Sequence, residues 1–380
     1  MGRLEEAALY LHVPFCRSKC PYCDFYSEPG GVTAELSRRY LEAVKAEVSR
    51  RKEEVSGYLF VTFYAGGGTP SLLGPAFYEE LLDFLSRELN FSPQELTLEA
   101  NPEGLTLSLL KEFRRLFDRL SLGAQSLLDE GLLALGRRHT VEEVFRAVDL
   151  SREAGFENLS LDLIFAWPGE SLSAFARELK ILASLSPEHV SCYELTLEPG
   201  TRFFRLHQEG RLRLPPEEEV VAMHHLAHEF LGEAGFEHYE ISNFARPGFR
   251  CRHNLFYWEV RPYLGLGPGA ASYLRGVRRK NEEDLAAYLE SLAGGGLPPA
   301  EEERLGPEER FREAVILGLR LLEGVDLGEL ERRFGFEPRA YYGKRLLRLL
   351  EEGLLVLEGE RLSLSERGRL LANVVFRELV

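Results

Sequence analysis

The chain has 380 residues, of which 44% are hydrophobic and 28% charged, as in an ordinary folded protein with one large α/β domain and a small second one. Its formal net charge of −15 argues against nonspecific binding to nucleic acid, because contacts to phosphates need a surplus of Lys and Arg.

The sequence also carries signals about location. The first residues lack the apolar core of a signal peptide, and no window approaches about 18 uncharged apolar residues, so we expect no secretion signal and no membrane-spanning helix. Five cysteines, three of them clustered, suit a reducing compartment better than a disulfide scaffold. These features predict a cytoplasmic protein, with peripheral contact to a membrane left open.

Short apolar segments alternate with amphipathic ones as far as about residue 245. The predicted strands are Leu9–Val13, Leu59–Tyr64, Leu96–Ala100, Leu120–Ala124, Leu159–Phe165, Val190–Leu195 and Tyr239–Ile241. The predicted helices between them are Leu36–Val48, Phe77–Leu89, Leu107–Phe117, Val141–Ala154, Phe175–Ala183 and Glu217–Ala234. This alternation is typical of a parallel sheet with outer helices, whose working groups lie at the carboxyl ends of the strands.

The first predicted strand leads into a loop with Cys16, Cys20 and Cys23, spaced C-x-x-x-C-x-x-C. Several thiolates on a short loop suit an iron–sulfur core, and three ligands on a four-iron cluster leave one iron open. Structural zinc prefers four ligands in separated pairs, c-type haem attachment needs His where Asp24 stands, and ferredoxins use a different first spacing. Three structural thiols are the simplest alternative, but the pattern favours an iron–sulfur site.

Glycine-rich or polar residues follow the next strands. The sequence GGGTP at 66–70 permits close backbone approach to a ligand and equally suits a tight turn. Glu99 ends the third strand, and Gln125 ends the fourth, with Arg137 a little further on; these groups suit polar ligands or a solvated surface. Asp162 lies among apolar residues of the fifth strand, so it must pair, with Arg137 as one candidate, or contact a ligand.

A pair of histidines stands out in the predicted helix 217–234. His224 and His228 are spaced i, i+4 and could share a metal ion from one helix face. However, the sequence lacks an H-E-x-x-H pattern and a further ligand at matching spacing, so a structural or surface role is favoured.

The stretch 251–258 reads Cys-Arg-His-Asn-Leu-Phe-Tyr-Trp. It places His253 and Asn254 about one helical turn before Tyr257 and Trp258, and a His beside flat aromatic side chains suits a haem pocket. The simpler alternative is an aromatic core around a hydrogen-bonded His. Cys251, like Cys192, is by default a buried free thiol.

The C-terminal part follows a glycine- and proline-rich stretch, Gly294–Pro299, that is typical of a linker. Helical patterns at 311–322, 327–334 and 340–352, a hairpin at 354–364 and a helix at 366–379 predict a winged-helix-like module. Its mixed charge favours an interaction or lid role over DNA binding. We therefore expect a barrel over 1–245, a segment 246–293 packed on it, a linker 294–305 and a C-terminal domain 306–380.

The cysteine loop after a strand resembles the signature of the radical S-adenosylmethionine (SAM) family. The run Leu9–Phe25 resembles its coproporphyrinogen dehydrogenase-like branch, and H-N-x-x-Y-W at 253–258 resembles the HemW-type haem chaperones of that branch. The resemblance extends over essentially the whole chain. It implies an α/β fold, a partial (β/α) TIM-like barrel with a small C-terminal winged-helix-like α+β domain.

The resemblance also implies roles for individual residues. A 4Fe–4S cluster would be held by Cys16, Cys20 and Cys23, with the amino and carboxylate groups of SAM on the open iron. The implied SAM-binding residues are Tyr10, Tyr22, Gly67, Gly68, Thr69, Glu99, Gln125, Arg137, Asp162 and Ala271. The implied haem-binding residues are His253 as iron ligand, Asn254, Tyr257 and Trp258, with Cys251 as an auxiliary.

These expectations predict a haem chaperone that binds a cluster, SAM and haem and delivers haem to haemoproteins, membrane respiratory proteins among them. One alternative is an oxygen-independent coproporphyrinogen III dehydrogenase, whose pattern has another Cys two residues after the third cluster ligand, where this chain has Phe25. A second alternative is a non-enzymatic cluster-bearing scaffold that docks a partner. The oligomeric state and the cleavage of SAM stay open.

Overall fold

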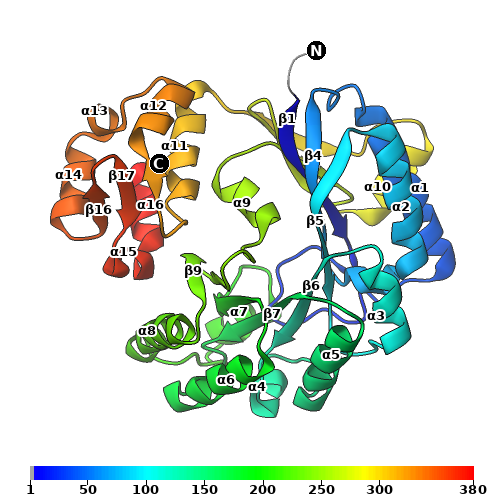
Figure 1. Ribbon diagram of the computed structural model, residues 1–380, viewed down its shortest axis with the longest axis horizontal. Helices are drawn as coiled ribbons and strands as arrows, with labels where there is room; N and C mark the ends of the chain where they lie inside the picture. The colour runs from blue at the N-terminus through cyan, green and yellow to red at the C-terminus, as the bar shows by residue number, and fades with distance from the viewer. Residues whose placement is uncertain (1–3) are drawn as a thin grey trace.

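The computed structural model describes residues 4–380 and contains one large curved sheet with helices along its outside and a smaller C-terminal domain beside it (Figure 1). The strands of the large part are β1 (Glu5–Val13), β2 (Phe15–Cys16), β3 (Glu28–Pro29), β4 (Tyr58–Gly67), β5 (Phe91–Ala100), β6 (Arg119–Gln125), β7 (Asn158–Phe165), β8 (His189–Glu194), β9 (Glu237–Glu240), β10 (Asn243–Ala245), β11 (Tyr263–Leu266), β12 (Ala271–Leu274), β13 (Val277–Asn281) and β14 (Ala300–Arg304). Its helices are α1 (Ala34–Arg51), the 3-10 turn η1 (Pro70–Leu73), α2 (Pro75–Glu88), α3 (Leu107–Arg114), α4 (Asp129–Ala134), α5 (Val141–Glu153), α6 (Leu172–Leu185), α7 (Arg202–Gln208), α8 (Glu217–Glu233), α9 (Arg252–Trp258) and α10 (Leu285–Ala293).

The large sheet has the strand order β14-β13-β12-β11-β1-β4-β5-β6-β7-β8-β10-β9. Neighbours from β11 through β1 and β4 to β8 pair in parallel, whereas the strands outside this run pair antiparallel. From β1 to β8 the parallel strands follow chain order with helices between them, which is a partial (β/α) barrel, so the predicted architecture of the large part is confirmed.

The two faces of the parallel strands differ in chemistry. Along β6, Leu120 and Leu122 belong to the apolar core between the sheet and its helices, whereas Ser121 and Gln125 face the inside of the barrel. Successive side chains of a strand point to opposite faces, so one strand serves both the core and the interior. The polar interior therefore opens at the carboxyl ends of the strands, and the core lies outside it.

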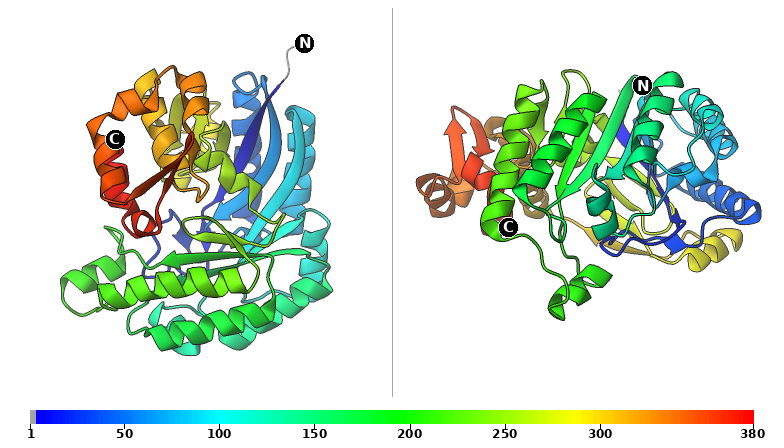
Figure 2. Two further views of the ribbon diagram at one scale, coloured as in Figure 1. Left: turned by 60° about the vertical axis from the view of Figure 1, so that its left-hand side comes forward. Right: turned by 90° about the horizontal axis from the view of Figure 1, so that it is seen from below.

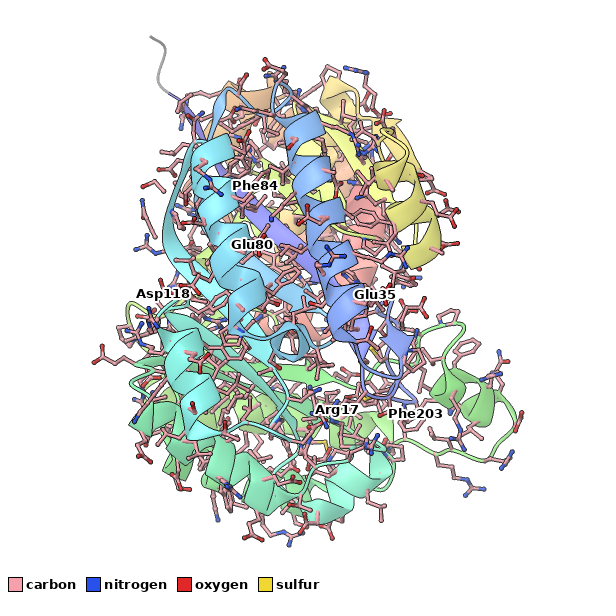
Figure 3. The ribbon with its side chains drawn as sticks, turned by 90° about the vertical axis from the view of Figure 1, so that its right-hand side faces the viewer. Arg17, Glu35, Glu80, Phe84, Asp118 and Phe203 are labelled. Atoms are coloured by element: carbon pink, nitrogen blue, oxygen red, sulfur yellow. The ribbon has the colours of Figure 1, made fainter. Side chains whose placement is uncertain are left out.

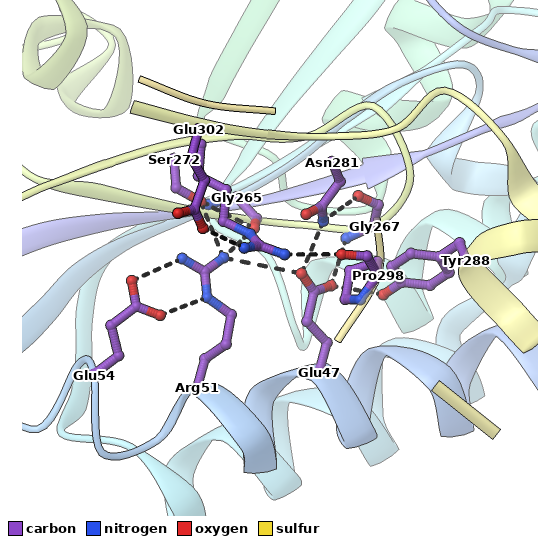
Figure 4. Close-up of polar contacts among 11 residues, drawn as sticks. Glu47, Arg51, Glu54, Gly265, Gly267, Ser272, Asn281, Tyr288, Pro298 and Glu302 are labelled. Atoms are coloured by element: carbon purple, nitrogen blue, oxygen red, sulfur yellow. Dashed lines mark hydrogen bonds and ion pairs between the residues drawn. The ribbon is translucent and has the colours of Figure 1, made fainter. Parts of the chain in front are cut away.

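A buried polar network joins α1 to the strands on the other side of β1 (Figure 4). Glu47 is fully buried and accepts hydrogen bonds from the Gly267 N–H at 3.0 Å, Asn281 Nδ2 at 2.8 Å and the Tyr288 hydroxyl at 2.7 Å. Burial raises the pKa of Glu47, and the hydrogen bonds around it offset part of that effect. The network holds the strands β11, β12 and β13 against the barrel, because a buried carboxyl group is costly unless its hydrogen-bond donors stay in place.

The smaller domain has its own elements and its own core, seen in two further views (Figure 2). They are α11 (Pro307–Gly318), β15 (Val325–Asp326), α12 (Leu327–Phe334), α13 (Pro338–Tyr342), α14 (Lys344–Glu351), β16 (Leu355–Glu358), β17 (Arg361–Leu364), α15 (Glu366–Leu370) and α16 (Ala372–Leu379). The helices surround a sheet of order β15-β17-β16 with one tight hairpin. This is the winged-helix-like arrangement that the sequence predicts.

Two details differ from the sequence predictions. Residues 300–304, inside the predicted linker, form β14, which pairs with β13 and extends the large sheet. The helices predicted at 340–352 and 366–379 are each broken, at Gly343 and at Leu371. Over residues 4–380, no helix is both long enough and apolar enough to cross a bilayer.

Candidate functional site

A cavity of about 580 Å³ opens at the carboxyl ends of the parallel strands. All three cysteines of the loop line it, and so do Glu99 from the end of β5 and Arg137 from the loop between α4 and α5. The predicted site residues that line this cavity are Cys16, Cys20, Tyr22, Cys23, Gly67, Gly68, Thr69, Glu99, Gln125, Arg137, Asp162 and Asn254. Most of the predicted cluster and SAM positions therefore share one space, although they come from six separate segments.

The cysteine loop has a defined path over the mouth of this cavity. It begins in β2, which pairs with β3, and the Gly31 N–H donates to the Cys16 carbonyl at 2.8 Å. Its turn is closed by the Cys23 N–H, which donates to the Cys20 carbonyl at 3.2 Å. On the outer side the Phe203 N–H of α7 donates to the Pro21 carbonyl at 2.9 Å. These contacts hold three thiols on one short, partly exposed turn.

The three thiols are free and partly exposed, and two of them accept hydrogen bonds. Thr69 Oγ1 donates to Cys16 Sγ at 3.6 Å, and Arg137 Nη1 donates to Cys20 Sγ at 3.1 Å. Burial raises the pKa of Cys16 and of Cys23. Free, soft sulfur ligands with a guanidinium beside them fit an anionic iron–sulfur core.

The GGGT sequence packs directly against the start of the loop. The Gly68 N–H donates to the Val13 carbonyl at 2.8 Å and the Thr69 N–H to the Phe15 carbonyl at 2.7 Å. Gly67 has a φ of +103°, and a Cβ there would meet the His12 ring at 2.6 Å. A side chain at either glycine would push the strand end away from β1, so the glycines keep this wall of the cavity close to the cysteine loop.

Glu99 is a buried carboxyl group in the cavity wall. The Tyr64 hydroxyl donates to Oε1 at 2.7 Å, and the Gly67 N–H donates to Oε2 at 3.2 Å. Burial raises the pKa of Glu99 to about 7, with the Asp162 charge adding to the shift and the two hydrogen bonds opposing it. Glu99 thus presents a buried carboxyl group, already held by two donors, to a polar ligand in the cavity.

Arg137 reaches across the cavity mouth to the cysteine loop. Its Nη2 donates to Asn101 Oδ1 at 2.6 Å, and Asn101 in turn donates through Nδ2 to Thr69 Oγ1 at 3.1 Å. Gln125 ends β6 in a left-handed conformation with φ of +66°, which a residue with a side chain rarely adopts unless its surroundings hold it there. The strand ends are thus tied to each other and to the loop by side chains.

The suggested pairing of Asp162 with Arg137 is wrong. Both carboxylate oxygens of Asp162 accept hydrogen bonds from Ser121 Oγ at 3.2 Å, and burial raises the pKa of this carboxyl group. Arg137 is engaged by the cysteine loop and Asn101 instead, so the two side chains have separate partners. Asp162 lines the cavity together with Arg119.

Two predicted SAM residues do not line the cavity. Tyr10 lies behind its wall, where its hydroxyl contacts His12 Nδ1 at 3.2 Å and its ring lies 6.2 Å from that of Tyr64. Ala271 lies on β12, and its carbonyl packs closely on Gly265. A Cβ added at Gly265 would lie only 2.0 Å from the Ala271 carbonyl oxygen. Their roles in SAM binding stay predictions.

The segment predicted to bind haem forms α9, which is anchored inside the barrel. Glu95 of β5 accepts hydrogen bonds from the Arg252 N–H and the His253 N–H, each at 3.0 Å, and from Cys251 Sγ at 3.6 Å. Burial raises the pKa of Cys251 to about 12. A buried carboxylate at the start of a helix satisfies its free N–H groups, so Glu95 fixes the position of α9.

His253 is only 1% exposed and uses both ring nitrogens within the protein. Nδ1 contacts Thr62 Oγ1 at 2.9 Å and Nε2 contacts the Tyr257 hydroxyl at 2.8 Å, and burial lowers the pKa of the ring to about 3. The Tyr64 ring lies 5.0 Å from it. Ligation of haem iron by His253 stays a prediction, and it requires one of these hydrogen bonds to break.

The two ends of α9 face different spaces. Asn254 lines the cavity that contains the cysteines, whereas Trp258 lines a separate groove of about 800 Å³ between the barrel and the C-terminal domain. Arg320 lies over the Trp258 ring, 4.3 Å from its centroid. The motif H-N-x-x-Y-W therefore spans the wall between the cysteine cavity and the domain junction.

The histidines of α8 have other partners. His224 Nε2 contacts Glu194 Oε2 at 2.8 Å, and His228 Nδ1 contacts His238 Nδ1 at 3.0 Å. In the part of the chain that the structure describes, no group of three or more His, Cys, Asp or Glu side chains is placed to hold a single metal ion. Both histidines thus have partners within the protein.

Sequence reasoning did not single out three residues that help to shape the cavity. Asn101 links Arg137 to Thr69, Tyr64 binds Glu99, and Ser121 binds Asp162. Each lies an even number of residues from another cavity-lining residue of the same strand or strand end. The alternation of side chains along a strand is therefore the signal that would have found them.

Comparisons with known proteins place this fold and site in a class. Residues 10–182 match the radical SAM superfamily model, and residues 305–371 match the HemN C-terminal domain model. The solved coproporphyrinogen III oxidase HemN from Escherichia coli has the same fold, with a TM-score of 0.84 at 23% identity over 99% of this chain and 90% of that one. The partial barrel with its cysteine loop is that of a radical SAM protein.

Curated relatives narrow the family. Heme chaperone HemW of Bacillus subtilis is 35% identical, covering 97% of each chain, and Heme chaperone HemW of Mycobacterium tuberculosis is 38% identical, covering 99% of this chain and 95% of that one. The Danio rerio radical S-adenosyl methionine domain-containing protein 1, mitochondrial, is 32% identical over 97% of this chain and 86% of that one. The chain belongs to the HemW family of the radical SAM superfamily, a family that implies a 4Fe–4S cluster and SAM.

Proposed function

We propose that this protein is a haem chaperone that carries a 4Fe–4S cluster and SAM and delivers haem to acceptor haemoproteins. The observation that carries the proposal is the full-length similarity to proteins named heme chaperone HemW, at 35–38% identity. The three free thiols that line one cavity support the cofactor part of it.

In this proposal Cys16, Cys20 and Cys23 hold the cluster, which supplies an open iron for SAM and one-electron chemistry. The chain's own residues position the ligands. Arg137 and Thr69 donate hydrogen bonds to two of the sulfur atoms and offset their negative charge. Glu99, Gln125 and Asp162 present polar groups to SAM from the strand ends, and Tyr22, Gly67 and Gly68 complete the wall beside the loop.

Haem binding is assigned to the segment 251–258. Asn254 faces the cysteine cavity and Trp258 faces the groove, so a haem on either side of α9 would contact this segment. Tyr257 forms a hydrogen bond with His253, and Cys251 forms one with Glu95, so these two residues support the haem site indirectly. The acceptors are haemoproteins, and membrane respiratory proteins are among the candidates.

A coproporphyrinogen III dehydrogenase is the second candidate, since the E. coli enzyme shares the fold. Phe25 argues against it, because it stands where the dehydrogenase pattern has another Cys, and its side chain is 66% exposed at the cavity mouth. A scaffold role without catalysis is the third candidate. We therefore favour the chaperone, without assigning an enzymatic reaction.

One experiment separates these functions. The protein is reconstituted anaerobically with iron and sulfide, loaded with haem, and mixed with an apo-haemoprotein; optical and EPR spectra follow the cluster, the haem and its transfer. We expect a 4Fe–4S signal, bound haem and transfer to the acceptor. Turnover of coproporphyrinogen to protoporphyrinogen by the same sample would overturn the chaperone in favour of the dehydrogenase. Zinc, or no metal, in the loop would overturn the cofactor assignment.

A further inference from the structure

Arg119 is a buried guanidinium group without an ion pair in the part of the chain that the structure describes. Its side chain is only 2% exposed, yet it lines the cavity that contains the cysteines. Within residues 4–380, Nε and Nη1 have no hydrogen-bond partner, and no carboxylate forms an ion pair with the group within 4.0 Å. A buried charge is costly unless it is paired, so an unpaired guanidinium in a cavity wall indicates a site for an anionic ligand.

Arg51, the other buried arginine of the described residues, shows how such a group is normally held. Its Nε and Nη2 donate to the Glu54 carboxylate at 2.8 and 3.1 Å, and its Nη1 donates to Ser272 Oγ at 3.1 Å (Figure 4). The carboxylates in the surroundings of Arg119 have other partners instead. Glu95 accepts hydrogen bonds from the N–H groups of α9, and Asp162 accepts them from serine hydroxyl groups.

Arg119 lies at the end of β6 that is farther from the cysteine loop. It begins the strand, whereas Gln125 ends it at the mouth of the cavity. With a rise of about 3.3 Å per residue, the two backbones lie roughly 20 Å apart. Figure 3 shows Asp118, which directly precedes Arg119, well apart from Arg17 of the cysteine loop. Arg119 therefore serves a different part of the cavity from Arg137, which reaches the loop itself.

The carboxyl groups beside Arg119 in the cavity carry less negative charge than exposed ones. Burial raises the pKa of Asp162, and it raises the pKa of Glu99 to about 7. A guanidinium, in contrast, keeps its proton in proteins. The balance of charge in the interior of the cavity therefore favours an anion at Arg119.

The other carboxylates that line the cavity lie at its mouth. Asp24 belongs to the cysteine loop, Glu194 ends β8, and Glu198 follows it. All three are partly or fully exposed, and Glu194 contacts His224 Nε2 at 2.8 Å. Water and salt screen exposed charges much more than buried ones, so these groups act weakly on a ligand at the far end of β6.

We propose that Arg119 binds a propionate group of the haem cargo, which places the haem on the side of α9 that faces the cysteine cavity. The inference rests on the haem binding of the proposed function. Asn254 of α9 lines the same cavity, and a planar guanidinium donates two parallel hydrogen bonds to one carboxylate. SAM, the other carboxylate ligand of the proposed function, uses its carboxylate at the open iron, near the opposite end of β6.

The groove on the other side of α9 offers arginines that are paired or exposed. Arg261 pairs with Glu6 at 2.6 Å, and Arg333 donates to two backbone carbonyl groups at 3.1 and 3.2 Å. Arg361 is exposed, and an ion pair in water contributes little. A propionate therefore gains more from Arg119 than from any of these three groups.

The test compares haem with haem dimethyl ester, whose methylated propionates carry no charge. Both are titrated optically into the cluster-loaded, full-length protein and into its variant Arg119→Gln. The matched control is Arg51→Gln, which removes the other buried guanidinium, in the network of α1 rather than in the cavity wall. Equilibrium dialysis measures the binding of SAM to each protein, and far-UV circular dichroism checks the fold.

We expect the unaltered protein and the control to bind haem at least about tenfold more tightly than the ester, since the ester cannot accept a charge-assisted pair of hydrogen bonds. Arg119→Gln should bind haem about tenfold more weakly and the ester equally well, so the ratio of the two affinities falls toward one. A side chain that only supported the fold would weaken both ligands alike. If Arg119→Gln does not fold, Arg119→Lys should lower the same ratio, because it loses the planar fork.

Equal affinities of the unaltered protein for haem and ester would overturn the proposal without any variant and leave haem binding itself standing. A ratio that Arg119→Gln leaves unchanged would also overturn it, since the propionate would then bind elsewhere. Weaker binding of SAM to this variant, with unchanged haem binding, would assign Arg119 to the SAM carboxylate instead. An unaltered protein that binds no haem would contradict the proposed function itself.

Discussion

The cysteine loop and α9 both have sequences that suggest a cofactor ligand, but the structure builds them in opposite ways. The thiols of the loop are partly exposed, free of disulfides and directed at one cavity. His253 of α9 is buried, and both of its ring nitrogens have partners in the protein. The loop is thus ready to accept ligands as it stands, whereas α9 would have to give up existing hydrogen bonds.

The difference follows from what holds each segment. Backbone hydrogen bonds shape the loop, including one from Phe203 of α7, so its thiols are left for a cofactor. Side chains from distant strands hold α9: Glu95 binds its first N–H groups, and Thr62 binds His253. Because the side chains that hold α9 are also its candidate haem-binding groups, His253 can bind iron only if α9 first loses a hydrogen bond. Mutations in α9 should therefore affect stability, whereas mutations in the cysteine loop should affect cofactor binding.

The largest expected effect is at the loop. Cys16→Ala, Cys20→Ala or Cys23→Ala should each abolish the cluster, because two thiolates cannot hold the four-iron core in place. The measurement is iron and sulfide content with the EPR spectrum after anaerobic reconstitution. Cys192→Ala is the matched control, since this thiol is buried away from the cavity and should leave the cluster unchanged.

An intact cluster in all three loop variants would remove the contrast between the regions, because the thiols would then be structural. The fold itself should survive these changes, since each of the three side chains is partly exposed. Far-UV circular dichroism of the apo-variants checks this point.

A smaller but clear effect is expected at α9. His253→Ala should lower the free energy of unfolding by about 2–4 kcal/mol, since it leaves a small cavity and strips the buried Thr62 hydroxyl and the partly buried Tyr257 hydroxyl of a partner. Urea denaturation measures the loss, and the partly exposed Asn254→Ala serves as the control, with a loss below about 1 kcal/mol.

The same variant sharpens the comparison through haem. If His253 ligates the iron, its loss should also change the haem spectrum and weaken haem affinity, in addition to lowering the stability of the haem-free protein. A stability loss with an unchanged spectrum would instead assign His253 to holding α9.

The sequence was a good guide where the determinants are local. The cysteine spacing, the glycines at 66–68 and the alternation of strands with helices predicted the loop, its neighbour and the parallel barrel. All of these depend on residues close in the chain, so their signal is visible without knowing the fold. In contrast, β14 follows a Gly- and Pro-rich stretch that looks like a linker, and only its pairing with β13 makes it a strand.

Long-range pairing was the part that the sequence did not reveal. His253 and its partner Thr62 are 191 positions apart, and Glu95 lies 158 positions from His253. The sequence offers Arg137 as a partner for Asp162, but the cysteine loop brings Cys20 to Arg137, and the end of β5 brings Asn101 to it. A buried polar side chain predicts that a partner exists, and only the packing of the barrel decides which one it is.

The most gradual effect concerns pH and Glu99, which links the two regions because Tyr64 binds this carboxyl group and its ring lies 5.0 Å from that of His253. Burial raises the pKa of Glu99 from 4.5 to about 7, so the folded state binds this proton more tightly than the unfolded state does. Between these two values the free energy of unfolding falls as pH rises, by up to about 1.4 kcal/mol per pH unit from this group. Glu99→Gln cannot titrate, so its stability should fall less steeply between pH 4.5 and 7 than that of the unaltered protein, as urea denaturation at several pH values will measure. Parallel curves for the two proteins would mean that Glu99 titrates normally and that the cavity wall around it is wet.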